Sequence, residues 1–338
     1  MAQITEYLEI LLDGVDLTFE QSTELLDSIF EGSVPEIQIA AFLTAMRAKG
    51  PVPAEIAGLA TSLRNHAVAV NPGIDNMIDT CGTGGAKLKT FNISTASAIV
   101  AASAGAYVAK HGNRGITSKC GSADVLEQLG INIDPGPKVV EKCIRDGHIG
   151  FMFAPKFHPA MKFVQPIRKA LGFRTIFNIL GPLANPAAAH AQVMGAADES
   201  LMTKIIETLK LLGLKHAIVV HSDGLDEISL ISPTKILQLN DGEITAGTID
   251  PADYEMEHAD FAQLKGSDAA GNAEIIKNIV SGKETGPKRD IVLLNTSAAL
   301  VTAGLAKDFK KGINMARKAI EDGRSKQTLE KFIELSNS

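Results

Sequence analysis

Residues 79–124 read DTCGTGGAKLKTFNISTASAIVAASAGAYVAKHGNRGITSKCGSAD, and the rest of the chain can be interpreted outward from this stretch. Between Thr80 and Ala123 it contains no Asp or Glu, although the whole chain has a formal net charge of −6. Glycines let a backbone approach a ligand closely, and hydroxyl residues before a helix leave N–H groups that point at anions. The stretch therefore predicts a cradle for a phosphate or a pyrophosphate.

The glycine-rich turn at 82–85 is a weak signal by itself. It lacks the GxxxxGK[ST] spacing of nucleotide-binding P-loops, and Lys87 stands where a dinucleotide fingerprint needs its third glycine. The case for anion binding depends on two further segments, NIST at 92–95 and KHGNRGITSKCGS at 110–122. Only the three features together favour an anion site.

From residue 71 onward, expected strands alternate with expected helices. The strands are at 77–79, 106–109, 149–153 and 216–221, and the helices are at about 94–105, 122–129, 137–146 and 199–212. This alternation predicts an α/β fold with a mainly parallel central sheet, whose ligands bind at the carboxyl ends of strands. Gly82 and Lys110 both fall at such ends. Residues 240–243 predict a hairpin turn, and further helices are expected near 271–281, 295–305 and 307–322.

The first 70 residues predict helices only, and residues 158–190 look helical again. Thr18 with Gln21, and Ser33 with Glu36, have the spacing of capping boxes. Apolar residues that recur at helical spacing predict a small packed bundle; they are Leu25, Ile29, Ile37, Phe42, Leu43 and Met46. The fold class is thus a small all-helical domain plus a larger α/β domain.

Composition narrows the functional classes. With 338 residues, 45% hydrophobic and 21% charged, the chain is typical of a soluble globular protein. No apolar run is long enough for a membrane span, and the N-terminus resembles no secretion signal, so a cytoplasmic protein is expected. Cys81, Cys120 and Cys143 have no metal-knuckle or disulfide-framework spacing. The acidic balance argues against a nucleic-acid partner.

Adjacent carboxylates at Asp226 and Glu227 follow the strand at 216–221. Alone, such a pair is more often a solvated loop, but opposite a polyphosphate it suits Mg²⁺. His111, His158 and Arg168 also have ordinary structural explanations.

Five motifs in the same order resemble the anthranilate phosphoribosyltransferase family. They are CGTGG (81–85), TFNIST (90–95), KHGNRGITSKCGSADVLEQLG (110–130), HPAMKFVQPIRKALGFRTIFNILGPLANP (158–186) and HSDGLDEIS (221–229). The resemblance spans nearly the whole chain. It implies a helical domain of residues 1–70 with a returning segment near 165–190, an α/β domain of 71–164 and 191–338, a cleft between them, and homodimers paired through the helical domain.

The resemblance also implies the reaction. The 5-phosphoribosyl group of 5-phosphoribosyl 1-pyrophosphate (PRPP) passes to the amine of anthranilate, which is the second step of tryptophan biosynthesis from chorismate, with Mg²⁺ as cofactor. No protein nucleophile is needed, and Lys110, Asn113 and Arg168 would position substrates and stabilise charge.

The resemblance assigns residues to three groups. The PRPP site would contain Gly82, Gly85, Ala86, Thr90, Asn92, Ile93, Ser94, Thr95, Lys110, His111, Gly112, Asn113, Arg114, Ser118 and Ser122. The anthranilate site would contain Gly82, His111, Asn113, His158, Arg168, Gly181 and Pro182. Ser94, Asp226 and Glu227 would hold Mg²⁺.

One position departs from the family pattern, in which GTGG is usually followed by Asp. This chain has Ala86 there, and we expect its loss of a carboxylate to reduce inhibition by excess Mg²⁺. Two other interpretations stay open from sequence: a pyrimidine nucleoside phosphorylase of the same architecture, and a non-catalytic relative that binds nucleic acid.

Overall fold

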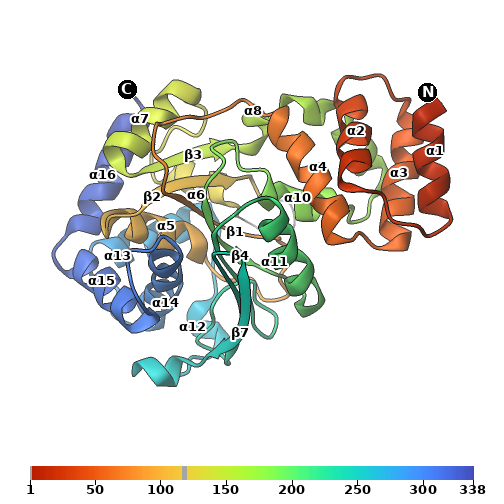
Figure 1. Cartoon of the computed structure of the whole chain (residues 1–338). Coiled ribbons are helices and arrows are strands. Elements are labelled where there is room, and N and C mark those ends of the chain that lie inside the picture. The colour runs from red at the N-terminus through yellow and green to blue at the C-terminus, as the bar shows by residue number, and fades with distance from the viewer. Residues whose placement is uncertain (1, 116–119) are drawn as a thin grey trace.

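The computed structural model describes residues 2–115 and 120–338 (Figure 1). The chain begins with α1 (Ala2–Leu12), α2 (Phe19–Phe30), α3 (Glu36–Lys49) and α4 (Pro53–Asn65). The predicted capping box of Thr18 and Gln21 is confirmed at the start of α2. The second predicted box is wrong, because α3 is capped by Pro35 without a side-chain bond, while the Ser33 hydroxyl donates to the Ser28 carbonyl at 2.8 Å.

The helical spacing predicted the buried side of these helices with one exception. Leu25, Ile29, Phe42, Leu43 and Met46 are buried in one apolar core. Ile37 was expected there as well, but it is 80% exposed, because it lies in the first turn of α3 on the side that faces away from the bundle.

The core of the larger part is a seven-stranded sheet in the order β3-β2-β1-β4-β5-β6-β7. The strands are β1 (Met77–Gly82), β2 (Tyr107–Gly112), β3 (Ile149–Phe153), β4 (Ala191–Gly195), β5 (His216–His221), β6 (Thr234–Asn240) and β7 (Glu243–Ile249). Strands β1 to β5 pair in parallel, and β6 and β7 are antiparallel. The predicted fold class is confirmed.

The predicted hairpin turn is confirmed between β6 and β7, where Asn240 pairs with Glu243. Asp241 and Gly242 have φ of 45° and 89°, the left-handed pair that such a two-residue turn requires.

Helices cover both faces of the sheet (Figure 1). They are α5 (Ile93–Ser103), α6 (Ser122–Gln128), α7 (Pro137–Gly147), α8 (Ala154–Phe157), α9 (Gln165–Leu171), α10 (Phe177–Leu183), α11 (Met202–Leu211), α12 (Phe261–Leu264), α13 (Ala269–Val280), α14 (Pro287–Thr302), α15 (Phe309–Glu321) and α16 (Arg324–Ser336), with short 3-10 turns at Pro159–Phe163, Glu199–Leu201 and Pro251–Tyr254. In the described part of the chain, none of the helices combines the length and apolar character that crossing a bilayer requires.

Some boundaries differ from the expected ones. The helix expected at 295–305 begins eight residues earlier, at Pro287, because a proline at the first position starts a helix well. Helix α16 was not predicted. Strand β2 continues to Gly112 rather than stopping at Ala109, so Lys110 lies within the strand.

Helices α9 and α10 return to the first four helices. Ile167, Phe177 and Leu180 belong to the same apolar core as Leu25 and Leu43. Both segments therefore pack together although about a hundred residues of sequence lie between α4 and α9.

Candidate active site

The glycine turn follows β1 directly and is enclosed by the loop after β5. Gly84 and Gly85 have φ of 67° and 85°, so both need the left-handed freedom of glycine. A Cβ on Gly82 would lie 2.5 Å from an Asp226 carboxylate oxygen. The ends of β1 and β4, paired at Gly82 and Gly195, are therefore packed against the Asp226 backbone and side chain.

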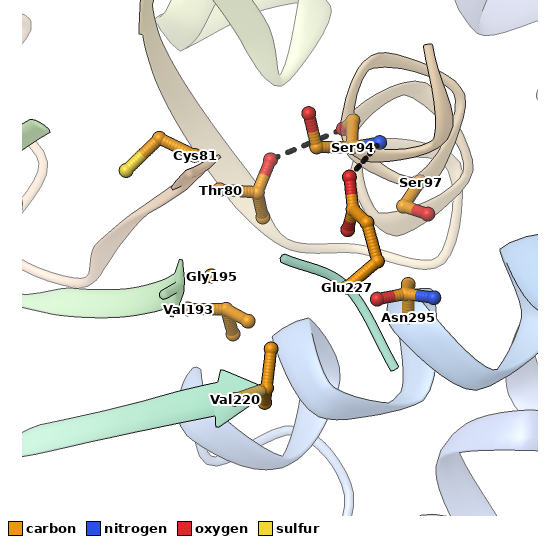
Figure 2. A pocket seen from close by; sticks show the side chains of 9 residues that line it. All are labelled: Thr80, Cys81, Ser94, Ser97, Val193, Gly195, Val220, Glu227 and Asn295. Atoms are coloured by element: carbon orange, nitrogen blue, oxygen red, sulfur yellow. Dashed lines mark hydrogen bonds between the residues drawn. The ribbon is translucent and has the colours of Figure 1, made fainter. Parts of the chain in front are cut away.

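Ser94 and Glu227 meet at the first turn of α5 (Figure 2). The Ser94 N–H donates to Glu227 Oε1 at 3.2 Å, and the Thr80 hydroxyl donates to the Ser94 carbonyl at 3.2 Å. A small cavity lies beside these groups, lined among others by Val193, Val220 and Asn295. Residues 133 positions apart thus meet at the carboxyl edge of the sheet.

Burial raises the pKa values of both adjacent carboxyls. The pKa of Glu227 is raised to about 8 by its burial and then by the charge of Asp226. Burial likewise raises the pKa of Asp226, whose carboxyl is faced by the Gly84 backbone N–H. Two half-buried carboxylates next to Ser94 fit a hard cation such as Mg²⁺, which takes its other ligands from water and substrate oxygens. The described residues contain no group of three acidic, His or Cys side chains that would make a complete cage.

Lys110 lies beneath this cluster rather than in open space. Its ammonium donates to the Thr80 carbonyl at 2.6 Å and to the Ser94 hydroxyl at 3.5 Å. Burial lowers the pKa of Lys110, and the negative charges of Asp79 and Glu227 oppose that shift. Burial raises the pKa of Asp79 to about 6; its oxygens accept from Asn185 Nδ2 at 2.8 Å and from the His111 N–H at 3.3 Å.

His111 and His158 form an uncharged wall near α10. Their ring centroids are 5.0 Å apart in an edge-to-face arrangement. Burial lowers the pKa of His111 to about 3 and that of His158 to about 4, so both are neutral at pH 7. The Gly181 backbone lies near His111, and the Pro182 carbonyl accepts from Gln192 Nε2 at 2.7 Å.

Arg168 lies on α9 with its guanidinium over the Phe177 ring, 5.3 Å from the centroid. Its hydrogen bond goes to the Gln165 amide oxygen at 3.3 Å, and no described carboxylate pairs with it. Burial lowers the pKa of Arg168, although arginine stays charged at neutral pH. A half-buried guanidinium that no carboxylate of the described chain pairs with is suited to bind the carboxylate of a substrate.

Residues of the KHGNR segment are less open than the sequence implied. The Arg114 guanidinium binds Asp124 at 2.9 Å and Glu127 at 2.9 and 3.1 Å, so carboxylates of α6 neutralise it. The Asn113 carbonyl accepts from the Ser122 hydroxyl at 3.3 Å. Ser118 lies outside the described residues.

The remaining expected PRPP residues border the same region. Ala86 and Ile93 are buried, Gly112 lies against Ser122, Thr90 bridges to Lys265, and the buried Thr95 hydroxyl makes no hydrogen bond within the described chain. The Asn92 amide accepts from Asn272 Nδ2 at 3.0 Å and from the Cys120 thiol at 3.2 Å.

Three residues that contact this region were not expected from the sequence. Asn272 holds Asn92, Asn295 holds Ile228, and Arg174 donates to the Gly84 carbonyl at 3.0 Å. The two asparagines had a signal, since a polar residue inside an apolar helical stretch needs a buried partner. Arg174 had none.

Two domain families match the chain. The helical bundle domain of the glycosyl transferase family matches residues 5–67, and the a/b domain of that family matches residues 74–326. Anthranilate phosphoribosyltransferase from Desulfatibacillum aliphaticivorans is 46% identical over 333 residues, which cover 98% of each chain. The enzyme of that name from Haloferax volcanii is 47% identical over 321 residues, covering 95% of this chain and 97% of its own.

Solved structures of enzymes with the same name are also similar to this chain. The crystal structure of anthranilate phosphoribosyltransferase from Thermus thermophilus has a TM-score of 0.93 at 34% identity and covers 98% of this chain and 99% of its own. The enzyme from Saccharomyces cerevisiae, in complex with PRPP and Mg, has a TM-score of 0.90 at 28% identity and covers 99% and 98%. The chain therefore belongs to the glycosyl transferase family with helical-bundle and a/b domains, and within it to the anthranilate phosphoribosyltransferases.

Proposed function

We propose that this enzyme transfers the 5-phosphoribosyl group of PRPP to the amine of anthranilate, releasing pyrophosphate. The observation that carries the proposal is the contact of Ser94 with Glu227 beside the glycine turn, because it joins a helix start, a carboxylate pair and a close-approach backbone at one edge of the sheet. Family membership supplies the substrates. Among the described residues of this region, no histidine contacts a hydroxyl or thiol as a base beside a nucleophile would, which agrees with direct substitution at C1.

The pyrophosphate of PRPP would lie on the glycine turn and the first turn of α5. The glycine turn lets the leaving group approach the backbone closely, and the positive end of the α5 dipole stabilises the negative charge that grows on that group. Ser94, Asp226 and Glu227 would hold Mg²⁺, which supplies Lewis-acid charge neutralisation when it is bound. The positive charge of Lys110 balances the negative charges of Glu227 and Asp79, and this attraction holds the carboxylates in place.

Anthranilate would enter beside α9 and α10. Arg168 would bind its carboxylate with a planar fork, stacked on Phe177. The neutral rings of His111 and His158 cannot protonate the attacking amine, whose lone pair must stay free. Catalysis then consists of positioning two substrates and stabilising charge.

We further propose that residues 1–70 and 165–190 form one helical domain and that residues 71–164 and 191–338 form the α/β domain. The apolar core that α2, α3, α9 and α10 share supports placing residues 165–190 with the first four helices, and the same core continues onto α11, β4 and β5. Homodimers would pair through the helical domain, where Leu12, Val15 and Ile37 are exposed. The free thiols of Cys81 and Cys143 support a cytoplasmic location.

The test is the decay of anthranilate fluorescence, which the chain does not obscure because it contains no Trp. We expect a decay that needs PRPP, Mg²⁺ and protein together, and that Glu227→Gln slows strongly. Lys169→Ala, an exposed cation on α9, is the matched control and should behave as wild type. Absence of decay, together with phosphorolysis of uridine or thymidine, would contradict the proposal and favour a nucleoside phosphorylase.

A further inference from the structure

We infer that Asn295 of α14 is a positioning residue that sets the geometry of the Asp226–Glu227 metal loop. Asn295 is not among the expected substrate or metal residues, and it lies on a helix with no predicted site residue. It is nevertheless 4% exposed and lies next to Glu227 (Figure 2). This inference rests on the proposed function, since it concerns how the carboxylates of that site are held.

The Asn295 amide pairs with both backbone groups of the residue that follows Glu227. Its Oδ1 accepts from the Ile228 N–H at 2.9 Å, and its Nδ2 donates to the Ile228 carbonyl at 2.8 Å. The same Nδ2 donates to the Ile291 carbonyl, one turn earlier in α14, at 2.9 Å. A side chain that grips N–H and C=O of one residue fixes both the position and the rotation of that peptide, as a neighbouring strand would.

The same helix also braces the other side of the metal site. Ser94 lies in the first turn of α5, and α5 packs directly on α14. The Thr296 hydroxyl donates to the Ser97 carbonyl at 3.4 Å, and the Ser97 hydroxyl donates to the Val292 carbonyl at 3.5 Å. Helix α14 therefore contacts both the loop that carries Glu227 and the helix that carries Ser94.

Rigid support matters because the two carboxyls are adjacent and half-buried. Their mutual repulsion favours any movement that separates them or exposes them to water. The Asn295 amide opposes this movement at the peptide next to Glu227. Partners behind metal ligands commonly change metal affinity by about 10–100-fold when removed.

The experiment measures binding of Mn²⁺, a paramagnetic substitute for Mg²⁺, by electron paramagnetic resonance in the presence of PRPP. We expect Asn295→Leu, which keeps the branched shape of the side chain but loses all three hydrogen bonds, to weaken Mn²⁺ binding by at least about tenfold. In turnover assays the Mg²⁺ activation constant should rise similarly, while the KM for anthranilate changes less than about twofold. Asn295→Ala leaves room for a bridging water and should give an intermediate loss.

Thr302→Val is the matched control. It also removes a buried hydrogen bond from α14, because the Thr302 hydroxyl donates to the Ala298 carbonyl at 2.7 Å, but it lies two turns from the loop. It should lower the unfolding temperature without changing Mn²⁺ affinity. Equal Mn²⁺ affinities for Asn295→Leu and Thr302→Val would overturn the inference. If Asn295→Leu does not fold, Asn295→Ala against Thr302→Val decides in the same way. Lack of turnover in the wild type would refute the proposed function. The comparison of Mn²⁺ affinities would still show whether Asn295 positions the metal ligands.

Discussion

The guanidinium of Arg174 donates to the Gly84 carbonyl at 3.0 Å and so joins the segment after α9 to the glycine turn. It lies directly on the turn, since a Cβ on Gly85 would be 2.5 Å from Arg174 Nη1. The Arg174 carbonyl in turn accepts from Arg47 Nη1 of α3 at 2.6 Å. A chain of contacts therefore runs from the first helices to the loop expected to bind pyrophosphate.

Arg174→Ala should raise the KM for PRPP by about fivefold, because an exposed charge-assisted hydrogen bond contributes about 1 kcal/mol. Steady-state kinetics with PRPP varied at saturating anthranilate measures this. Arg174→Lys keeps a donor and should recover part of the affinity. A change confined to the KM for anthranilate would contradict the prediction.

Arg168→Ala should raise the KM for anthranilate by about 10–100-fold, since a charged hydrogen-bonded partner contributes about 1.5–3 kcal/mol. The KM for PRPP should stay the same. Fluorescence assays over a wide anthranilate range check both constants, with Lys169→Ala as control. If PRPP binding weakens equally, Arg168 supports the fold of α9 rather than the anthranilate site.

Ala86→Asp should make the enzyme more sensitive to excess Mg²⁺. The position is buried beside the glycine turn, so a carboxylate there would offer an additional metal ligand beside the pyrophosphate that we expect on this turn. Rate measured against Mg²⁺ concentration should then pass through a maximum and fall at high concentration more steeply than in the wild type. Ala86→Asn has the same shape without the charge and is the control. Identical curves for wild type and Ala86→Asp would refute the idea.

Much of this architecture could be predicted because the signals are local. Strand β5 has exactly the predicted bounds, and the glycine turn lies where a strand end placed it. Spatial neighbours were harder to predict. The segment without Asp or Glu nevertheless has carboxylates as neighbours in the fold. Asp124 and Glu127 pair with Arg114, and the charge of Glu227 acts on the Lys110 ammonium. Such pairings depend on tertiary packing.

The supporting residues show the same limit. An asparagine in an apolar helix indicates a buried partner, but only the fold reveals that the partner of Asn295 is the peptide after Glu227. The exposure of Ile37 is similar. Helical spacing predicts which side is apolar, whereas burial depends on how much of that side the neighbouring helices cover.

Acid should destabilise the protein through its buried histidines. The pKa of His158 is about 4 in the folded protein against an ordinary 6.5, so between these values the unfolded chain holds a proton that the folded chain lacks. Stability is therefore full above pH 6.5 and falls as pH falls through this window. From pH 6.5 to 5 the loss is about 2 kcal/mol for this residue.

His158→Phe should remove that dependence. No described residue forms a hydrogen bond of good geometry with either ring nitrogen, although the Leu63 and Ala184 backbones lie near, so an apolar ring should be accepted. Urea unfolding gives the free energy of unfolding at pH 7.5 and at pH 5.0. The difference between these two values should be about 2 kcal/mol smaller in the variant than in the wild type. His190→Gln removes an exposed histidine as control. An unchanged pH dependence in His158→Phe would show that the ring is not the group responsible.

Ile37→Asp should dissociate the proposed homodimer. Ile37 is 80% exposed on α3. Leu12, the last residue of α1, and Val15 in the following loop are 69% and 56% exposed, so the helical domain presents large apolar side chains to its surroundings. Burying a carboxylate in the centre of such an interface without a partner is strongly unfavourable. Sedimentation velocity should give a dimer for the wild type and a monomer for the variant. Leu211→Asp, which changes an equally apolar residue that is 56% exposed on α11, is the control and should remain a dimer. If Leu211→Asp dissociates the dimer and Ile37→Asp does not, the subunits pair through the α/β domain instead.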